Sequence, residues 1–109
     1  MFDEWESDHE YPTLFRVDRD VVVSTAEALP STGRKLAGQP PIWVRSFGLQ
    51  IEPQMQGRQI AWVRRSNGGW LAVVLVPAAS GNGRSRLTIP LWLDPSMVST
   101  GSAPDGSGR

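Results

Sequence analysis

The stretch AWVRRSNGGWLAVVLV, residues 61–76, decides the fold of this chain. Its Asn67-Gly68 pair is a strong turn signal, because both residues tolerate the positive φ angles that a tight hairpin turn needs. The pair separates two apolar runs, and the second run, residues 70–76, contains no polar side chain. These features predict a hairpin over residues 60–76 with two apolar faces.

A two-residue type I′ turn at Asn67-Gly68 is predicted to set the register of this hairpin, with Arg65 opposite Trp70. The face with the larger side chains is the predicted core, and it comprises Ile60, Trp62, Arg64, Leu71, Val73 and Leu75. The opposite face is smaller and flatter, and it comprises Ala61, Val63, Arg65, Trp70, Ala72, Val74 and Val76. A turn longer by one residue would exchange the faces, since side chains alternate along a strand.

Two apolar faces leave two alternatives for the hairpin. A solvated antiparallel sheet has one polar face, so this hairpin is either central and covered on both sides, or covered on one side by a partner. A large exposed apolar patch is unusual on a monomer, and an arginine beside a tryptophan is typical of binding hot spots. On this basis the predicted partner-binding residues are Arg65, Trp70, Ala72 and Val74.

The N-terminal half is predicted to contain a second hairpin and a short helix. Apolar β-forming residues flank Asp18-Arg19, which favours a turn at that pair. Ser24 and Glu27 have the spacing of a capping box, and a proline soon after them limits the helix to one or two turns. Residues 31–41 are predicted to be a loop because they are rich in glycine and proline.

The C-terminal half is predicted to be mostly strand. Residues 42–53 are predicted to form a β region bent at Gly48, followed by a connector over residues 54–57. Residues 86–93, RLTIPLWL, alternate between aliphatic and other side chains. Pro90 lacks an N–H group, which places this last strand at a sheet edge or at a bulge.

Short strands with turn signals about every ten residues predict a mainly β fold, either a small antiparallel barrel or a rolled sheet, with one short helix. The last strands and the DPSMV segment (94–98), predicted as a turn or short 3₁₀ helix, are similar in architecture to an SH3-like barrel. The chain has 109 residues, which fits one domain. The predicted divisions are an acidic arm over 1–12, either flexible or anchored by its aromatic residues, a β-rich domain over 13–98 and a disordered tail over 99–109.

The composition excludes several kinds of site. Cysteine is absent, so the chain has no disulfide, no thiolate metal site and no thiol nucleophile. His9 is the only histidine and lies in the acidic arm, where one imidazole among solvated carboxylates is a poor metal-ligand set and a poor catalytic base. The glycine-rich turns lack the spacing and the lysine of a phosphate loop. We therefore expect a protein that is not an enzyme and that uses no metal or other cofactor.

Hydropathy gives expectations about localisation. No apolar run approaches the ~18–20 residues that span a bilayer. The N-terminal segment is acidic and lacks the basic start and the apolar stretch of a secretory signal. These observations predict a cytoplasmic protein without a membrane partner.

Charge is unevenly distributed, although the net charge of the chain is zero. Residues 1–28 carry a net charge of −6, and residues 29–109 carry +6. The asymmetry either marks a basic binding face or reflects attraction between two halves of one fold. Arginines interleaved with tryptophans also suit single-stranded nucleic acid, and the contacts predicted for that ligand are Arg45, Arg64, Arg65, Arg84, Arg86 and Trp92.

These observations lead to two functional hypotheses. The first is a small protein–protein interaction or assembly module that binds another protein or a second copy of itself, as a homodimer. The alternative is a small nucleic-acid-binding barrel that uses its arginine–tryptophan face. A larger species made of protein alone would favour the first hypothesis, and copurifying nucleic acid would favour the second.

Overall fold

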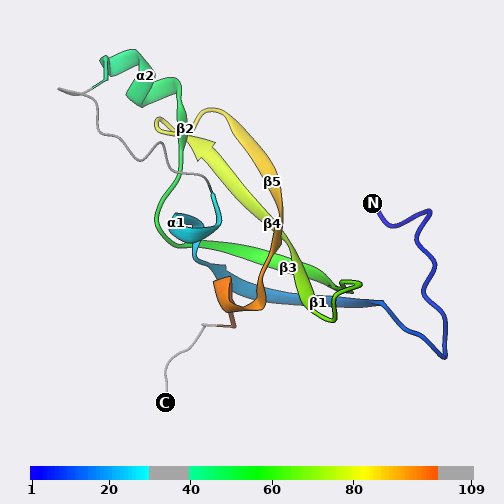
Figure 1. Ribbon diagram of the computed structural model, residues 1–109. Helices are drawn as coiled ribbons and strands as arrows, with labels where there is room; N and C mark the ends of the chain where they lie inside the picture. The colour runs from blue at the N-terminus through cyan, green and yellow to red at the C-terminus, as the bar shows by residue number, and fades with distance from the viewer. Residues whose placement is uncertain (30–39, 101–109) are drawn as a thin grey trace.

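The computed structural model describes residues 1–29 and 40–100, whose main feature is one antiparallel sheet (Figure 1). Its strands are β1 (Leu14–Val23), β2 (Leu49–Gln50), β3 (Met55–Arg64), β4 (Trp70–Ser80), β5 (Arg86–Leu93) and β6 (Val98–Ser99). The helices are α1 (Thr25–Ala28), α2 (Ile42–Phe47) and the 3₁₀ helix η1 (Pro95–Met97). Most of the loop predicted over 31–41 and most of the tail predicted over 99–109 lie outside the described residues.

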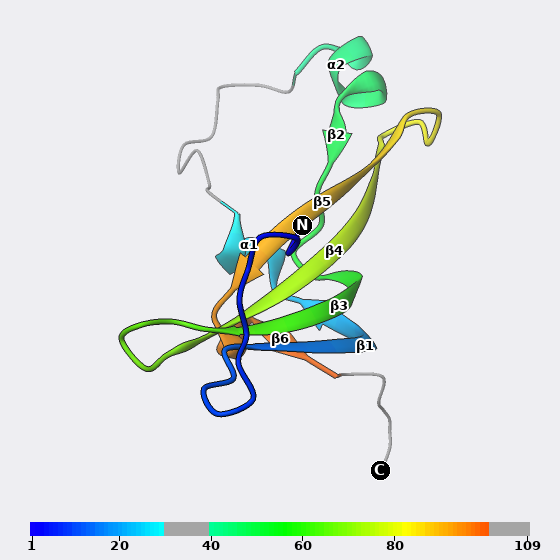
Figure 2. The same cartoon turned by 90° about the vertical axis from the view of Figure 1, so that its right-hand side faces the viewer.

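The sheet has six strands in the order β2-β4-β3-β1-β6, and β5 pairs with β4 as well. All of these pairings are antiparallel. The sheet rolls around its inner face but does not close into a barrel (Figure 2). The predicted mainly β, antiparallel class is therefore confirmed, whereas the closed form and the analogy with an SH3-like barrel are not. The described residues contain two α-helices, where one was predicted.

The β3–β4 hairpin is central in the sheet, but the predicted two-residue turn is wrong. The N–H of Gly68 donates to the carbonyl of Arg65 (2.9 Å), and the N–H of Arg65 donates to the carbonyl of Gly69 (2.8 Å). Gly68 has a φ of +92°. A turn followed by a left-handed glycine is the three-residue hairpin loop with a bulge, and it shifts the register by one residue. Trp70 therefore pairs with Arg64 instead of Arg65.

The register shift redistributes the apolar residues between the two faces. On β4, Ala72, Val74 and Val76 point to the inner face and have no exposed surface. Trp62, predicted on the opposite face from these residues, pairs with Ala72 and packs against the same core. Both faces are apolar, as predicted. However, residues that were predicted to share a face lie on opposite faces of the sheet. Val74 is thus a core residue.

The larger core fills the inner face and draws on strands from both sides of the hairpin. It consists of Val21, Val23, Ala72, Val74, Val76 and Leu93. Partly buried Ile89 and Leu91 of β5 pack against this core, so the predicted alternation along β5 is confirmed there. Pro90 pairs with Leu75 of β4. Among the strands described, β5 pairs with β4 alone, so Pro90 lies on an edge strand as predicted.

The outer face carries a smaller core, which the acidic arm helps to cover. This core consists of Ala61, Val63 and Val73, with Phe2, Leu14 and Ile60 packed against it. The ring of Phe2 lies 6.0 Å from the ring of Trp92, and the guanidinium of Arg16 lies 5.4 Å from the centre of the Phe2 ring. The hydroxyl of Ser7 accepts the backbone N–H of Thr13 at 3.2 Å. These contacts fold the arm back over the sheet.

The N-terminal hairpin predicted around Asp18-Arg19 is wrong, because β1 continues through both residues. The pairing of β1 with β3 shifts between Arg16 and Arg19, so the extra residues form a bulge instead of a chain reversal. A matching irregularity lies in β3 between Gln59 and Ala61, where β3 pairs with β4. Bulges bend a strand and change the direction of nearby side chains. The β3 bulge lies beside Gln59, a residue of the candidate site described below.

Residues 42–47 form α2 where a strand was predicted, and only Leu49–Gln50 is extended. The carbonyl of Pro41 accepts the N–H groups of Val44 (3.0 Å) and Arg45 (3.1 Å). Pro41 is the N-cap, with an extended ψ of 154°, and the helix begins at the next residue. The helix forms although isoleucine, tryptophan and valine have high β propensity.

The remaining short elements agree with the sequence in part. α1 and η1 confirm the predicted short helix and the predicted 3₁₀ segment. Ser24 is the N-cap of α1, but its side chain makes no capping hydrogen bond, so the predicted capping box is not formed. β3 begins at Met55, so most of the connector predicted over residues 54–57 is strand. β6 extends the domain to Ser99, one residue past the predicted boundary.

Candidate functional site

An apolar hollow of about 380 Å³ opens near the turn of the β3–β4 hairpin, and we call it the aromatic pocket. It is lined by Phe15, Trp62, Trp70 and Pro95. The sheet register explains how these residues meet, because Phe15 of β1 pairs with Trp62 of β3 and Trp70 begins β4. Pro95 is the first residue of η1. Four separate elements therefore each contribute one wall.

The rings of the aromatic pocket remain partly accessible to solvent. Phe15 is 41% exposed, and Trp62 and Trp70 are half-buried. The rings of Phe15 and Trp70 lie 5.6 Å apart and are inclined at 46°. Large aromatic side chains that are not fully covered supply a sizeable apolar contact area at low cost in side-chain entropy. The pocket can therefore accept an apolar side chain.

Each tryptophan of the pocket carries an arginine over its ring. The guanidinium of Arg64 lies 4.8 Å from the centre of the Trp70 ring. The guanidinium of Arg19 lies 5.4 Å from the centre of the Trp62 ring. Such cation–π contacts hold the guanidinium groups at the pocket without neutralising them. Two positive charges therefore lie beside the tryptophan rings that line the pocket.

A buried amide fixes the position of Arg19. Gln59 has no exposed surface, and its Oε1 accepts a hydrogen bond of 2.8 Å from Nε of Arg19. Its Nε2 donates to the carbonyl of Ala61 at 3.0 Å. The β3 bulge between Gln59 and Ala61 makes room for this interaction, since it brings a carbonyl within reach of the Gln59 side chain. Gln59 is thus a positioning residue for the pocket.

Asp94 holds the fourth wall in place. Its Oδ2 accepts hydrogen bonds from the backbone N–H of Ser96 (3.0 Å) and from the Ser96 hydroxyl (2.6 Å). These hydrogen bonds, and more weakly the positive charge of Arg65, lower the pKa of Asp94 below its usual value. The carboxylate thereby caps η1 and orients Pro95 toward the tryptophans. Arg65 itself is exposed in the hairpin turn.

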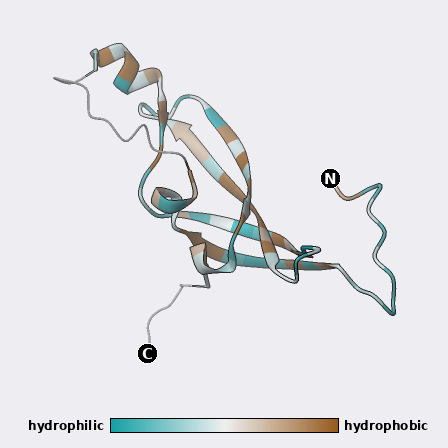
Figure 3. Ribbon diagram, in the orientation of Figure 1, coloured by the Kyte–Doolittle hydropathy of each residue, from teal (hydrophilic) through white to brown (hydrophobic). Residues whose placement is uncertain are grey.

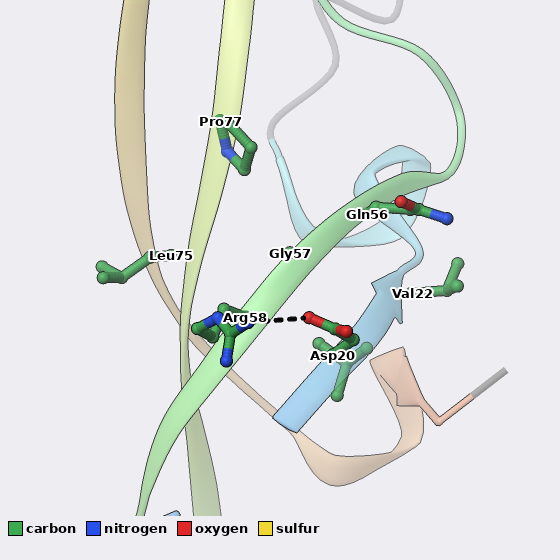
Figure 4. Close-up of a pocket in the computed structure, with 8 residues that line it drawn as sticks. Asp20, Val22, Gln56, Gly57, Arg58, Leu75 and Pro77 are labelled. Carbon is green, nitrogen blue, oxygen red and sulfur yellow. Dashed lines mark ion pairs between the residues drawn. The ribbon is translucent and has the colours of Figure 1, made fainter. Parts of the chain in front are cut away.

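A second hollow of similar size, about 370 Å³, lies over β1, β3 and β4 (Figure 4). Its most prominent charged group is Arg58, which binds Asp18 and Asp20, the latter at 3.4 Å. These carboxylates raise the pKa of Arg58 and satisfy its charge. This hollow has no aromatic ring among its lining residues. It therefore offers a ligand no ring to stack on, unlike the aromatic pocket.

The predicted partner-binding residues do not form one surface. Trp70 lines the aromatic pocket, and Arg65 lies in the adjoining turn. Ala72 and Val74 have no exposed surface and belong to the inner core, so their predicted position on an exposed face is wrong. The cause is the one-residue longer turn, which moved these two side chains to the interior.

The residues predicted to bind nucleic acid are dispersed over three places. Arg64 and Arg65 lie at one end of β4, beside the aromatic pocket. Arg45 of α2, with Arg84 and Arg86 near the β4–β5 turn, lies at the opposite end. β4 has 11 residues, so its ends are about 33 Å apart at ~3.3 Å per residue. Trp92 lies under Phe2 on the outer face instead of in the pocket. No single basic groove unites them.

Sequence reasoning missed several residues of the pocket: Phe15, Trp62, Pro95, Arg19 and Gln59. The sequence predicts Trp62 in the interior because of its size and its position in the strand. Phe15 and Pro95 carry no signal until the register of β1 and the position of η1 are known. Gln59 carries no clear signal either, because β3 also contains Gln56, Arg58 and Arg64.

Further observations limit the chemistry of the described region. Within residues 1–29 and 40–100, no group of three or more histidine, aspartate and glutamate side chains is arranged to hold a metal ion. No helix in this part of the chain is long and apolar enough to cross a membrane. Comparison with known proteins adds no relative, because no family model, no curated protein and no solved structure matches this chain.

Proposed function

We propose that this protein is a protein–protein interaction module whose aromatic pocket binds an acidic segment of a partner. One observation carries the proposal: an accessible apolar pocket built from Phe15, Trp62 and Trp70 has an arginine over each tryptophan ring. Tryptophan and arginine are the residues that most often dominate the binding energy of protein interfaces. The pocket accepts one apolar anchor side chain, and the arginines bind carboxylates on either side of it.

The size of the pocket supports a peptide side chain as the occupant. A volume of about 380 Å³ lies near the lower end of the range for small-molecule sites. Aromatic-lined grooves recur in domains that recognise extended peptides, where they hold a proline or an aromatic ring. The occupant we propose is an extended segment with one aromatic residue or proline between acidic residues.

A second copy of this chain offers such a segment. Residues 1–12 contain five acidic residues on both sides of Trp5. Trp5 is 51% exposed, although its Nε1 donates to the hydroxyl of Thr13 at 3.1 Å. A peptide of residues 1–12 is therefore a suitable probe of the pocket. A homodimer would follow if the arm of one copy bound the pocket of another.

Single-stranded nucleic acid is the second candidate ligand. The specific observation in its favour is the same pair of arginine–tryptophan stacks, because a base can stack on an exposed indole while a guanidinium contacts a phosphate. The dispersion of the other arginines weighs against it, since a nucleic-acid groove uses a continuous basic track. The peptide is therefore the favoured ligand.

Fluorescence anisotropy with a labelled peptide of residues 1–12 tests the proposal. The wild-type protein is expected to bind it, and Trp70→Ala is expected to weaken binding by about tenfold, as for a moderate hot spot. Trp43→Ala is the matched control, because Trp43 is exposed in α2 and lies outside the pocket. A peptide with its acidic residues replaced by the corresponding amides should bind weakly. Circular dichroism establishes that both variants are folded.

Labelled oligothymidylate, measured in the same assay, separates the two candidates. Binding of oligothymidylate without binding of the acidic peptide would make single-stranded nucleic acid the favoured ligand. If neither probe binds at low salt, or if Trp70→Ala and Trp43→Ala lose the same affinity, the aromatic pocket is not the contact site. Arg64→Gln adds a further check, because it should weaken binding of the acidic peptide and reduce the salt dependence of that binding.

A further inference from the structure

The short helix α2 presents its apolar side chains to solvent. None of its residues is buried. Ile42 is 78% exposed, Trp43 is 68% exposed and Phe47 is 61% exposed. Hydrophobic residues recur along this helix in Figure 3. A single exposed apolar residue is ordinary on a protein surface, but three large ones on one short helix form a patch that is typical of a binding surface.

Within the described residues, backbone hydrogen bonds hold α2 in place. An isolated helix of this length is unstable in water, so another part of the chain has to support it. The N–H of Asn82 donates to the carbonyl of Ser46 (2.8 Å), and the N–H of Gly81 donates to the carbonyl of Gly48 (3.0 Å). The β4–β5 turn thus supports the end of α2. This arrangement leaves the apolar side chains free for another surface.

The apolar patch continues beyond α2 and is accompanied by positive charge. Leu49 of β2 is 51% exposed. Three arginines belong to the same end of the molecule: Arg45, Arg84 and Arg86. Residues 40–51 and 79–87 contain no acidic residue, and Glu52, which lines a hollow with Gly83 and Arg86, is the acidic residue that adjoins them. We call this combination of α2, β2 and the β4–β5 turn the distal tip, and its net charge is positive.

The shape of the distal tip distinguishes a lipid surface from a protein partner. Figures 1 and 2 both show α2 projecting beyond the sheet at the end where the β4–β5 turn lies. A projecting tip with tryptophan, phenylalanine and isoleucine side chains can enter the boundary between headgroups and acyl chains without a matching cavity. A protein partner would have to fit both this projection and a hollow of about 940 Å³ that is lined by residues of α2 and β2. Aromatic residues also favour the membrane interface.

The acidic arm lies where it does not oppose contact between the distal tip and an anionic surface. In both views the arm lies away from α2, on the side where β1 begins. Its five acidic residues would therefore stay in water when the distal tip meets a negatively charged surface. Charges more than about 8–10 Å from the surface are largely screened at physiological ionic strength. The uneven charge of the chain thus favours the orientation in which the distal tip faces the anionic surface.

We propose that the distal tip is a site for peripheral binding to an anionic lipid surface. Ile42, Trp43 and Phe47 insert at the interface, and the three arginines of the tip contact the headgroups. The sequence-based expectation of no membrane partner rested on the lack of a spanning segment, and a surface-bound element does not cross the bilayer. The site is separate from the aromatic pocket, so it does not depend on the proposed peptide-binding function.

Cosedimentation of the full chain with vesicles tests this proposal. Vesicles of phosphatidylcholine with phosphatidylserine are expected to sediment the protein, and vesicles of phosphatidylcholine alone are not. Trp43→Ala should lower the partition coefficient by about tenfold, since it removes one inserted indole. Arg84→Gln should lower it by about fivefold. Trp5→Ala is the matched control, because Trp5 is similarly exposed but belongs to the arm.

Three results would overturn the proposal. The first is an absence of sedimentation with anionic vesicles at low salt. The second is equal binding to neutral and anionic vesicles, which would remove the role of the arginines. The third is a loss of binding that is the same for Trp5→Ala and Trp43→Ala. Trp43 packs into no core, so circular dichroism should show that its variant is folded, and a negative result cannot be attributed to unfolding.

Discussion

The substitution Val74→Ala examines the register of the central hairpin through stability. Val74 has no exposed surface and lies in the inner core with Val21 and Val76. In the register expected for a two-residue turn, the same side chain would lie on the exposed, partner-binding face. Removal of the valine methyl groups destabilises the isolated protein if Val74 is buried, and leaves its stability nearly unchanged if Val74 is exposed.

The expected loss follows from the size of the deleted group. Two methylene equivalents removed from a buried site lose about 1.6 kcal/mol of transfer free energy, at ~0.8 kcal/mol each. The cavity left behind adds to this, because a rolled sheet collapses only partly around it, and the total is about 2–3 kcal/mol. For a domain of this size, that change lowers the melting temperature by about 10–20 °C.

Urea denaturation followed by tryptophan fluorescence measures this loss. The matched control is Val22→Ala, which lies two strands away and is only half-buried, and this substitution should cost about 1 kcal/mol or less. The slope of the unfolding free energy against urea should be unchanged in both variants, since the surface exposed on unfolding is nearly the same. A loss below about 0.5 kcal/mol for Val74→Ala, of the kind seen for surface substitutions, would refute the buried assignment.

Three further predictions concern the periphery of the fold. Phe2→Ser should uncover the outer-face core and increase the binding of a hydrophobic dye, while the circular dichroism spectrum stays native. Unchanged dye binding would show that the arm does not protect this face. Hydrogen bonds to Ser96 lower the pKa of Asp94 below 3.8, so the carboxylate stabilises the fold above that pH and loses this effect as the pH falls through the lowered pKa. Asp94→Ala should therefore weaken the acid-induced drop in melting temperature. An identical drop in the variant and the wild type would show that Asp94 does not cap η1. Removal of residues 101–109, which contain no large apolar side chain, should leave the melting temperature unchanged, whereas removal from Val98 onward should lower it by taking β6 away from β1.

The alternation of side chains was the most reliable signal in the sequence. It predicted the aliphatic face of residues 86–93, which depends on the period of two within one strand. The central hairpin followed from the Asn67-Gly68 turn signal between apolar runs, and the edge position of Pro90 from its missing N–H group. The register of the hairpin could not be derived in the same way. It depends on whether Gly68 occupies the second position of a type I′ turn or the left-handed position after a longer turn, and SNGG is compatible with both.

The aromatic pocket was harder to predict because it depends on contacts between distant segments. Trp70 and Arg65 were identified from their local pattern, but Phe15 reaches the pocket only through the pairing of β1 with β3. The role of Gln59 depends on a bulge that has no sequence signature. α2 was missed because the side chains of residues 42–47 favour strands, and its contact with the β4–β5 turn is visible only in the fold.

The most direct test of the aromatic pocket uses the five tryptophans as internal reporters. Indole N–H resonances of the nitrogen-15-labelled protein would be followed by NMR during titration with the unlabelled acidic peptide of residues 1–12. Binding at the pocket predicts the largest shifts for Trp62 and Trp70, and small ones for Trp43 and Trp92, which lie in α2 and on the outer face. Shifts concentrated at Trp43 or Trp92, or no shifts at saturating peptide, would contradict the assignment of the pocket as the binding site.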